Sequence, residues 1–126
     1  MQIETPIYII EEDLLRRNLS LIADVARRAD VEIIMAFKAF ALWKTFPIIR
    51  EYIGSTTASS LSEAKLAFEE FGSPAHTYSP AYKSSEMAEI ARMSSHLTFN
   101  SLSQFETMSS LALKANPELL LGVRVT

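Results

Sequence analysis

The sequence predicts an α/β protein built around a parallel sheet. Short apolar segments alternate with stretches of helical periodicity, and from residue 33 onward these segments recur about every 20 residues. Strands that alternate regularly with helices pair in parallel and place the helices outside the sheet. The binding groups of such a sheet gather at the carboxyl ends of its strands.

Two architectures fit this alternation. One is a complete five-stranded doubly wound parallel sheet of the flavodoxin type, for which a chain of 126 residues is long enough. The other is the N-terminal part of a (β/α)8 barrel, whose complete form needs roughly 250 residues. The last apolar segment, Leu119–Val125, almost reaches the final residue and has no helix after it. We therefore expect an incomplete barrel.

Composition limits the possible functions. The net charge of −3 and the absence of clustered Lys and Arg argue against a nucleic-acid surface, although mild acidity suits a cationic substrate. The lack of cysteine excludes disulfides and thiolate chemistry, and three scattered glycines cannot form a glycine-rich phosphate loop. No His/Asp/Glu cluster has metal-ligand spacing. No secretory signal and no apolar run of roughly 18 residues occurs, so we expect a soluble cytoplasmic protein.

The first elements are predicted from apolar runs and helical spacing. Ile7–Ile10 is a short apolar run that predicts a strand. Glu12–Ala29 predicts a long amphipathic helix, with acidic residues in its first turn and arginines in its last. Its predicted apolar face consists of Leu15, Leu19, Ile22 and Ala26. Ile33–Phe37 predicts a buried strand, and Phe46–Ile53 predicts a helix that tolerates Pro47 in its first turn.

The remaining elements alternate regularly. The predicted strands are Ser55–Ala58, Ala75–Tyr78, Leu97–Asn100 and Leu119–Val125. Ser60–Glu63 and Ser103–Glu106 each have the Ser-x-x-Glu pattern of a capping box, in which both side chains accept free N–H groups at a helix start. We expect the first of these helices to end at Gly72 and the second to reach about Ala115. Ser84–Met93 predicts the helix between them.

Lys38 is the first candidate for chemistry because it directly follows the apolar strand Ile33–Phe37. A charged amine is costly to bury without a partner, and desolvation favours its neutral, nucleophilic form. Such an amine can form a Schiff base with an aldehyde cofactor. The alternative is a lysine at a strand end whose ammonium group reaches water. The residues alone leave both interpretations open.

Several segments around Lys38 resemble those of a known enzyme group. Met35–Phe40, after a strand and a long helix, is similar to the opening of pyridoxal-phosphate (PLP) enzymes with an alanine racemase-type barrel. A wider set of segments resembles the carboxynorspermidine decarboxylases and covers nearly the whole chain. These segments are Ala39–Pro47, Ser55–Glu63, His76–Tyr82 and Phe99–Gln104. Ornithine and diaminopimelate decarboxylases usually have an asparagine soon after the lysine, where this chain has Phe40 and Trp43.

The resemblance implies a PLP-dependent carboxy-lyase of norspermidine and spermidine biosynthesis, in which Lys38 forms the Schiff base. Its substrate would be carboxynorspermidine or carboxyspermidine, and enzymes of this kind are homodimers. Residues 1–126 would form part of the PLP-binding barrel. The strand Ile7–Ile10 would join a second, β-rich domain that follows later in such enzymes, as does the cofactor phosphate loop. The chain alone would then be inactive.

Two further positions can be compared with this enzyme group. Arg124 matches an arginine that lies close to the cofactor in relatives, so the resemblance implies a cofactor-binding role. The alternative is an arginine paired with a neighbouring carboxylate, because a cation in an apolar strand needs a partner. Thr57 stands where several relatives carry an aspartate near the lysine. A threonine cannot supply that negative charge, which agrees with the narrower decarboxylase group.

Other polar residues near strand ends have simpler interpretations. His76 and His96 each begin a predicted strand, at the end of the sheet opposite the expected site, so we expect structural roles for them. Tyr78 and Tyr82 are expected to pack in the core. Asn100–Ser101 ends a strand on the functional side, and it either lines the pocket or caps the next helix.

Two other function classes remain open from the sequence. One is a non-enzymatic PLP-binding barrel that serves cofactor homeostasis and also attaches the cofactor to a lysine. The other is a doubly wound binding domain in which Lys38 is incidental. An incomplete barrel would leave two open sheet edges and an apolar interior, so we expect the chain alone to self-associate or aggregate.

Overall fold

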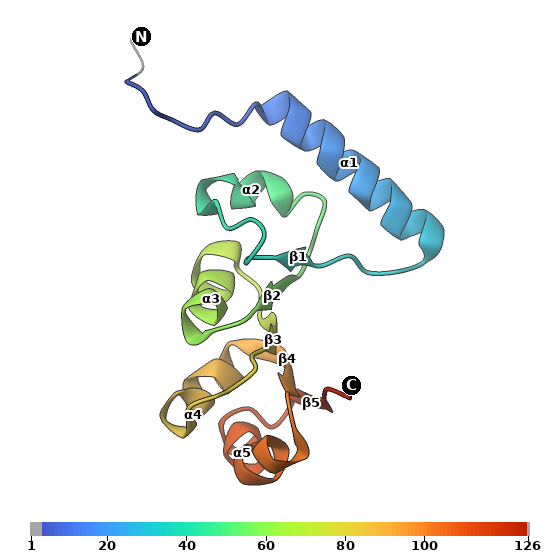
Figure 1. Cartoon of the computed structure of the whole chain (residues 1–126). Coiled ribbons are helices and arrows are strands. Elements are labelled where there is room, and N and C mark those ends of the chain that lie inside the picture. The colour runs from blue at the N-terminus through green and yellow to red at the C-terminus, as the bar shows by residue number, and fades with distance from the viewer. Residues whose placement is uncertain (1–3, 126) are drawn as a thin grey trace.

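A parallel sheet of five strands forms the centre of the structure, a computed structural model that describes residues 4–125. The strands are β1 (Met35–Ala36), β2 (Thr56–Ala58), β3 (Ala75–Tyr78), β4 (Ser94–Phe99) and β5 (Leu120–Val123). They pair in the order β1-β2-β3-β4-β5, so each strand lies beside its neighbours in the sequence (Figure 1). All of these pairings are parallel. The predicted parallel α/β sheet is therefore confirmed.

Helices precede the sheet and connect its strands. The helices are α1 (Glu12–Ala29), α2 (Phe46–Ile49), α3 (Leu61–Lys65), α4 (Ser84–Arg92) and α5 (Leu102–Ala115). A 3-10 turn, η1 (Trp43–Thr45), leads into α2, and a π-helical segment, η2 (Leu66–Phe71), continues α3. Gly72 follows η2 in the left-handed conformation, with φ of 77°, which confirms the predicted helix end.

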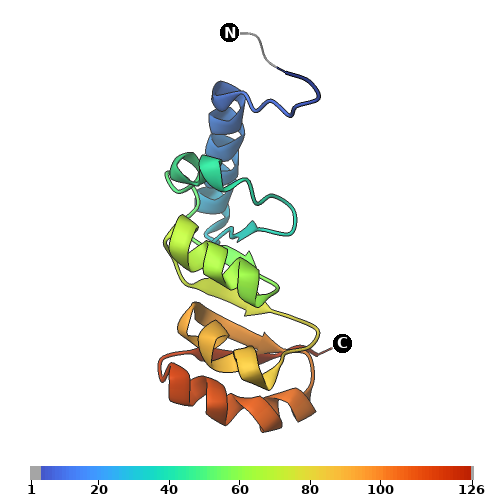
Figure 2. The same ribbon diagram turned by 90° about the vertical axis from the view of Figure 1, so that its left-hand side faces the viewer.

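The connecting helices α2 to α5 cover one face of the sheet, and Figure 2 looks onto that face. Parallel strands joined through a helix cross over in the right-handed sense almost without exception, so a sequential strand order puts every connecting helix on the same side. A doubly wound sheet instead reverses its strand order and carries helices on both faces. The doubly wound alternative is therefore wrong, and the arrangement is that of consecutive units of a barrel wall.

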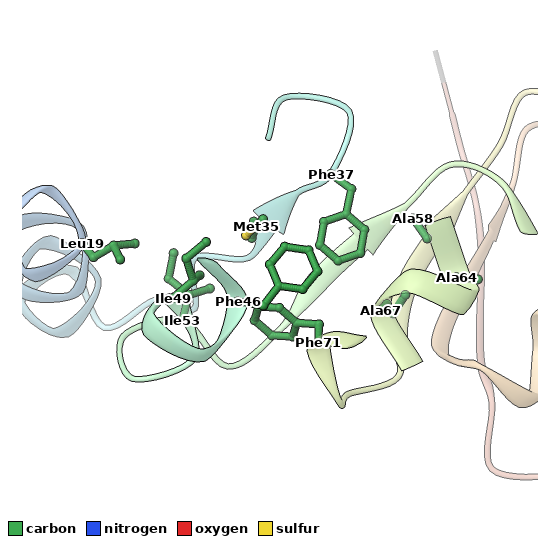
Figure 3. Close-up of a cluster of buried hydrophobic side chains, with 11 residues drawn as sticks. Leu19, Met35, Phe37, Phe46, Ile49, Ile53, Ala58, Ala64, Ala67 and Phe71 are labelled. Atoms are coloured by element: carbon green, nitrogen blue, oxygen red, sulfur yellow. The ribbon is translucent and has the colours of Figure 1, made fainter. Parts of the chain in front are cut away.

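Two apolar clusters pack the helices onto the sheet. The N-terminal cluster contains three aromatic rings, Phe37, Phe46 and Phe71, whose centroids lie 5.2 to 6.3 Å apart (Figure 3). Phe37 extends from the end of β1, while Phe46 and Phe71 come from α2 and η2. The second cluster includes Phe99 of β4, whose ring packs edge-on against Tyr82. Each cluster fixes a strand to the helices that follow it.

The long helix α1 contacts the rest of the fold through its first half. Leu19 is buried and joins the N-terminal cluster beside Ile49 (Figure 3). The guanidinium of Arg16 donates hydrogen bonds of 2.6 and 3.1 Å to the two carboxylate oxygens of Glu51. Ile22, further along the predicted apolar face, is 36% exposed. The predicted bounds of this helix are confirmed, but its apolar face is covered only in part.

The bounds of several strands differ from the prediction. Ile7–Ile10 forms no strand and its side chains are exposed, because no strand among residues 4–125 lies beside it. Of the strand predicted at Ile33–Phe37, only Met35 and Ala36 form β1, and the chain turns at Phe37. β4 begins at Ser94, before the predicted Leu97–Asn100, since a buried serine carries the strand further back than the apolar run.

The two predicted capping boxes have different outcomes. Ser60 caps α3 as predicted, because its hydroxyl accepts the N–H of Glu63 at 3.2 Å. In a capping box the Glu63 carboxylate would accept the N–H of the N-cap residue. Here it accepts the N–H of the residue before the cap, Ser59, at 2.7 Å. The box predicted at Ser103–Glu106 is wrong: α5 begins earlier, and its N-cap is Ser101, whose hydroxyl accepts a backbone N–H three residues further along. α5 therefore begins at Leu102, directly after this cap and only three residues after the end of β4 at Phe99.

Candidate functional site

An open cavity of about 330 Å³ lies on the face of the sheet opposite α2 to α5. Side chains along a strand point alternately to opposite faces, and residues that alternate with the cavity lining, such as Phe37 and Leu97, are buried in the apolar clusters. The cavity is lined by Ala36, Lys38, Thr57, Ala58, Ser59, His76, Thr77, Tyr78, His96 and Thr98. This face therefore carries hydroxyl and imidazole groups beside its apolar surface.

The strand register arranges the cavity side chains in two rows. The first row consists of the paired residues Ala36, Thr57, His76 and His96. In the second row, Tyr78 pairs with Thr98, and Lys38 follows Ala36 by the same step of two residues. The second row is nearer the carboxyl ends of the strands. Lys38 and Tyr78 therefore lie at the rim of the cavity, with the imidazoles beneath them.

Lys38 occupies the turn that directly follows β1. The carbonyl oxygen of Ala36 accepts the N–H groups of Ala39 and Phe40, at 2.9 and 3.1 Å, which closes this turn. The predicted position of Lys38 at the end of the first strand is confirmed. Its side chain is exposed and lines the open cavity, which agrees with the alternative of a lysine at a strand end that reaches water.

Arg124 and Tyr78 meet at the same edge of the sheet. Nη1 of Arg124 donates a hydrogen bond of 2.7 Å to the Tyr78 hydroxyl, and Cζ of Arg124 lies 5.7 Å from the centroid of that ring. The Tyr78 hydroxyl donates in turn to Oδ1 of Asn100, at 2.8 Å. Within residues 4–125, Arg124 forms no ion pair. The alternative of a carboxylate-paired arginine is therefore wrong for the described part of the chain.

His76 and His96 stack face to face in the cavity. Their ring centroids are 4.0 Å apart and the ring planes are inclined by 23°. Burial lowers the pKa of His76, the charge of His96 lowers it further, and the carboxylate of Glu32 partly opposes this shift. Their expected place at the far end of the sheet is wrong, because both rings line the cavity of Lys38. β4 starts at Ser94, so His96 lies inside the strand.

The cavity has a hydroxyl group, and no acid, at the position of Thr57. Thr57 lines the cavity one row below Lys38. Within the described chain, none of the lining residues is Asp or Glu. Residues 4–125 also contain no cluster of three or more His, Cys, Asp or Glu side chains that could hold a metal ion.

The two tyrosines and the Asn100–Ser101 pair have different roles, because some of these residues belong to the cavity and others support the fold. Tyr82 is 9% exposed, its hydroxyl donates to the carbonyl oxygen of Thr98 at 3.0 Å, and burial raises the pKa of Tyr82 to about 12. Its predicted core role is confirmed, whereas Tyr78 lies in the cavity. Ser101 caps α5 and the side chain of Asn100 bonds to Tyr78. Strand alternation, which places Tyr78 on the same face as His76, is the sequence signal that could have found it.

The chain is similar to polyamine-pathway decarboxylases. It is 43% identical, over 96% of its length, to a carboxynorspermidine/carboxyspermidine decarboxylase of Campylobacter jejuni, of which it covers 33%. It is 40% identical, over 90% of its length, to a carboxyaminopropylagmatine decarboxylase of Synechocystis, of which it covers 32%. The chain therefore spans about a third of the length of these relatives. No protein-family model matches it.

A solved structure matches the fold. The crystal structure of carboxynorspermidine decarboxylase complexed with norspermidine, from C. jejuni, superposes with a TM-score of 0.87 at 42% identity. The match covers 94% of this chain and 31% of that one. The predicted resemblance to these decarboxylases is confirmed, as is the fold expected from it. In the described part of the chain, none of the helices combines the length and the apolar character needed to cross a lipid bilayer.

Proposed function

We propose that the chain forms the N-terminal part of a PLP-dependent carboxynorspermidine/carboxyspermidine decarboxylase, in which Lys38 attaches the cofactor. The observation that carries this proposal is the position of Lys38 at the end of β1, where its side chain lines an open cavity. Barrel enzymes have their reacting groups at this end of the strands. The similarity to relatives with this name supports the same choice.

The residues around Lys38 suit pyridoxal phosphate. The cofactor needs an amine for its aldehyde group and room for a planar aromatic ring. The cavity of about 330 Å³ falls within the usual range of ligand pockets, roughly 300–1,000 Å³. Among the described residues Lys38 forms no ion pair, so its amine is available to a ligand.

The side chains of the cavity would have separate roles. Bound pyridoxal phosphate would accept the electron pair that is left when carbon dioxide departs. Lys38 would hold the cofactor at the rim, beside the hydroxyls of Tyr78 and Thr98 in the same row. His76 and His96 would close the cavity from beneath, and the lowered pKa of His76 would keep that ring neutral near pH 7.

The proposed substrate is a carboxylated polyamine, either carboxynorspermidine or carboxyspermidine. Relatives that match the chain along most of its length carry these names. We propose that the complete protein acts as a homodimer in the cytoplasm and that Ile7–Ile10 joins a second, β-rich domain. The exposure of this apolar segment supports its pairing with a strand outside residues 4–125.

Borohydride reduction in the presence of PLP, followed by peptide mapping, tests the role of Lys38 on the protein expressed from its complete coding sequence. We expect the label on the peptide that contains Lys38, and Lys38→Ala should remove it. Lys44→Ala is the matched control, because Nζ of Lys44 lies 5.3 Å from the centroid of the Trp43 ring and Lys44 does not line the cavity. That variant should keep its label.

The pattern of outcomes separates the alternatives. Label on another lysine, or no label, would contradict the proposed attachment site. Label on Lys38 in a protein that releases no carbon dioxide from carboxynorspermidine or carboxyspermidine would favour a non-enzymatic PLP-binding barrel. Label on Lys38 together with release of carbon dioxide supports the decarboxylase.

A further inference from the structure

A chain of side-chain hydrogen bonds joins the carboxyl ends of β3, β4 and β5. Arg124 donates to the hydroxyl of Tyr78 at 2.7 Å, and this hydroxyl donates to Oδ1 of Asn100 at 2.8 Å. A phenol has a single proton, so a hydroxyl that accepts from an arginine must donate elsewhere. The amide oxygen of Asn100 accepts that proton. The two bonds are therefore compatible and strengthen each other.

These contacts restrain the guanidinium of Arg124. The ring of Tyr78 lies 5.7 Å from Cζ, within the range of a cation–π contact. The backbone N–H of Arg124 donates to the carbonyl oxygen of Phe99 at 2.8 Å, which holds the main chain at the same place. An arginine fixed in this way loses less conformational freedom when a ligand arrives.

The restrained cation retains donors for a ligand. A guanidinium has five N–H groups, and the Tyr78 hydroxyl takes one of them. Arg124 is exposed and forms no ion pair within the described residues. Arginine N–H groups bind anionic oxygens more strongly than neutral ones. Tyr78 also lines the cavity of Lys38, so the guanidinium lies beside the place where a ligand of Lys38 would sit.

We propose that Tyr78 and Asn100 are positioning residues that act through Arg124, holding its guanidinium ready for an anionic oxygen of pyridoxal phosphate. This inference rests on the proposed function, because the ligand is the cofactor attached at Lys38. Loss of the Tyr78 hydroxyl leaves Arg124 to be ordered at the moment of binding. The affinity for the cofactor then falls, while the ring and the fold are retained.

A double-mutant cycle on the protein from the complete coding sequence tests this coupling. The apparent Kd for PLP is measured from the absorbance of the bound cofactor in wild type, Tyr78→Phe, Arg124→Gln and the double variant. Tyr78→Phe should weaken binding roughly three- to tenfold in the wild-type background and hardly at all in the Arg124→Gln background. Asn100→Asp keeps an acceptor oxygen, so it should bind more tightly than Asn100→Leu.

Tyr82→Phe is the matched control, since it removes a hydroxyl that bonds to the main chain in the core. Its effect on affinity should be the same with and without Arg124. An equal loss from Tyr78→Phe in both backgrounds would overturn the proposal, and so would unchanged affinity in Arg124→Gln. Wild type that takes up no PLP at Lys38 would overturn the proposed function together with this inference, and that result precedes any comparison of variants.

Discussion

His76 and His96 put two titratable rings in contact inside the cavity of Lys38. Neutral imidazoles stack without electrostatic repulsion, whereas two protonated rings with centroids 4.0 Å apart repel each other. Burial adds to this effect and is the larger cause of the lowered pKa of His76. Protonation of His76 is therefore coupled to folding.

We expect stability to fall as the pH decreases through the ordinary titration range of histidine. Unfolded His76 takes up its proton near pH 6.5, while folded His76 takes it up only at lower pH. In that window the unfolded state binds more protons, so the free energy of unfolding rises with pH. Thermal melts between about pH 5 and 8 should show a steeper dependence for wild type than for His76→Gln. Equal slopes would contradict the coupling.

The candidate site is predictable from the sequence where its signal is local. Lys38 is visible because a single cation directly follows an apolar run. The partnership of Tyr78 with Arg124 spans 46 residues and depends on the register of β3, β4 and β5. Strand alternation gives the face on which Tyr78 lies, but not its neighbours across the sheet. Asn100 could not be assigned for the same reason.

At the scale of elements, the start of α5 shows how two overlapping capping patterns are resolved. Ser101 with Gln104 and Ser103 with Glu106 both fit the spacing of a capping box. The structure uses Ser101, which has an extended backbone with φ of −155°. The side-chain amide of Gln104 donates to the carbonyl oxygen of Pro80 at 2.9 Å, which ties the helix start to the segment after β3. This tertiary contact is absent from the local pattern.

Ser101→Ala should lower the free energy of unfolding by about 1 kcal/mol, because the cap of α5 is lost. Glu106→Ala is the matched control, as Glu106 is exposed on the same helix and should change stability by only a few tenths of a kcal/mol. Urea unfolding of both variants measures the difference. A larger loss of stability in Glu106→Ala than in Ser101→Ala would instead support a capping box formed by Ser103 and Glu106.

At the scale of the whole molecule, the architecture depends on which edge of the sheet each successive strand joins. Strand–helix alternation predicted the parallel sheet, and most helices have the predicted bounds within a few residues. The choice between a barrel wall and a doubly wound sheet could not be made from periodicity, because both have the same local pattern. It depends on whether each new strand joins the same edge, as it does here from β1 to β5.

We expect the 126-residue chain alone to self-associate, since β1 and β5 each have a neighbour on one side only. Unpaired strand edges recruit other strands, and Leu120 on β5 is 59% exposed. Sedimentation at increasing concentration should give masses above the 14.1 kDa of one chain. Leu120→Lys should reduce the effect, because charge on an edge strand opposes pairing. A single 14.1-kDa species with a cooperative melt would contradict this expectation.

The sequential strand order also determines when each contact becomes possible during synthesis. Paired residues lie only 19 to 24 positions apart, as in Thr57–His76 and His96–Leu120. Such short separations keep the contact order low and favour rapid folding. Every strand after β1 meets a partner that the ribosome has already made. If synthesis stops after any of these strands, every strand already made has its preceding partner. Only the last strand made still lacks a neighbour, which is the next strand in the sequence.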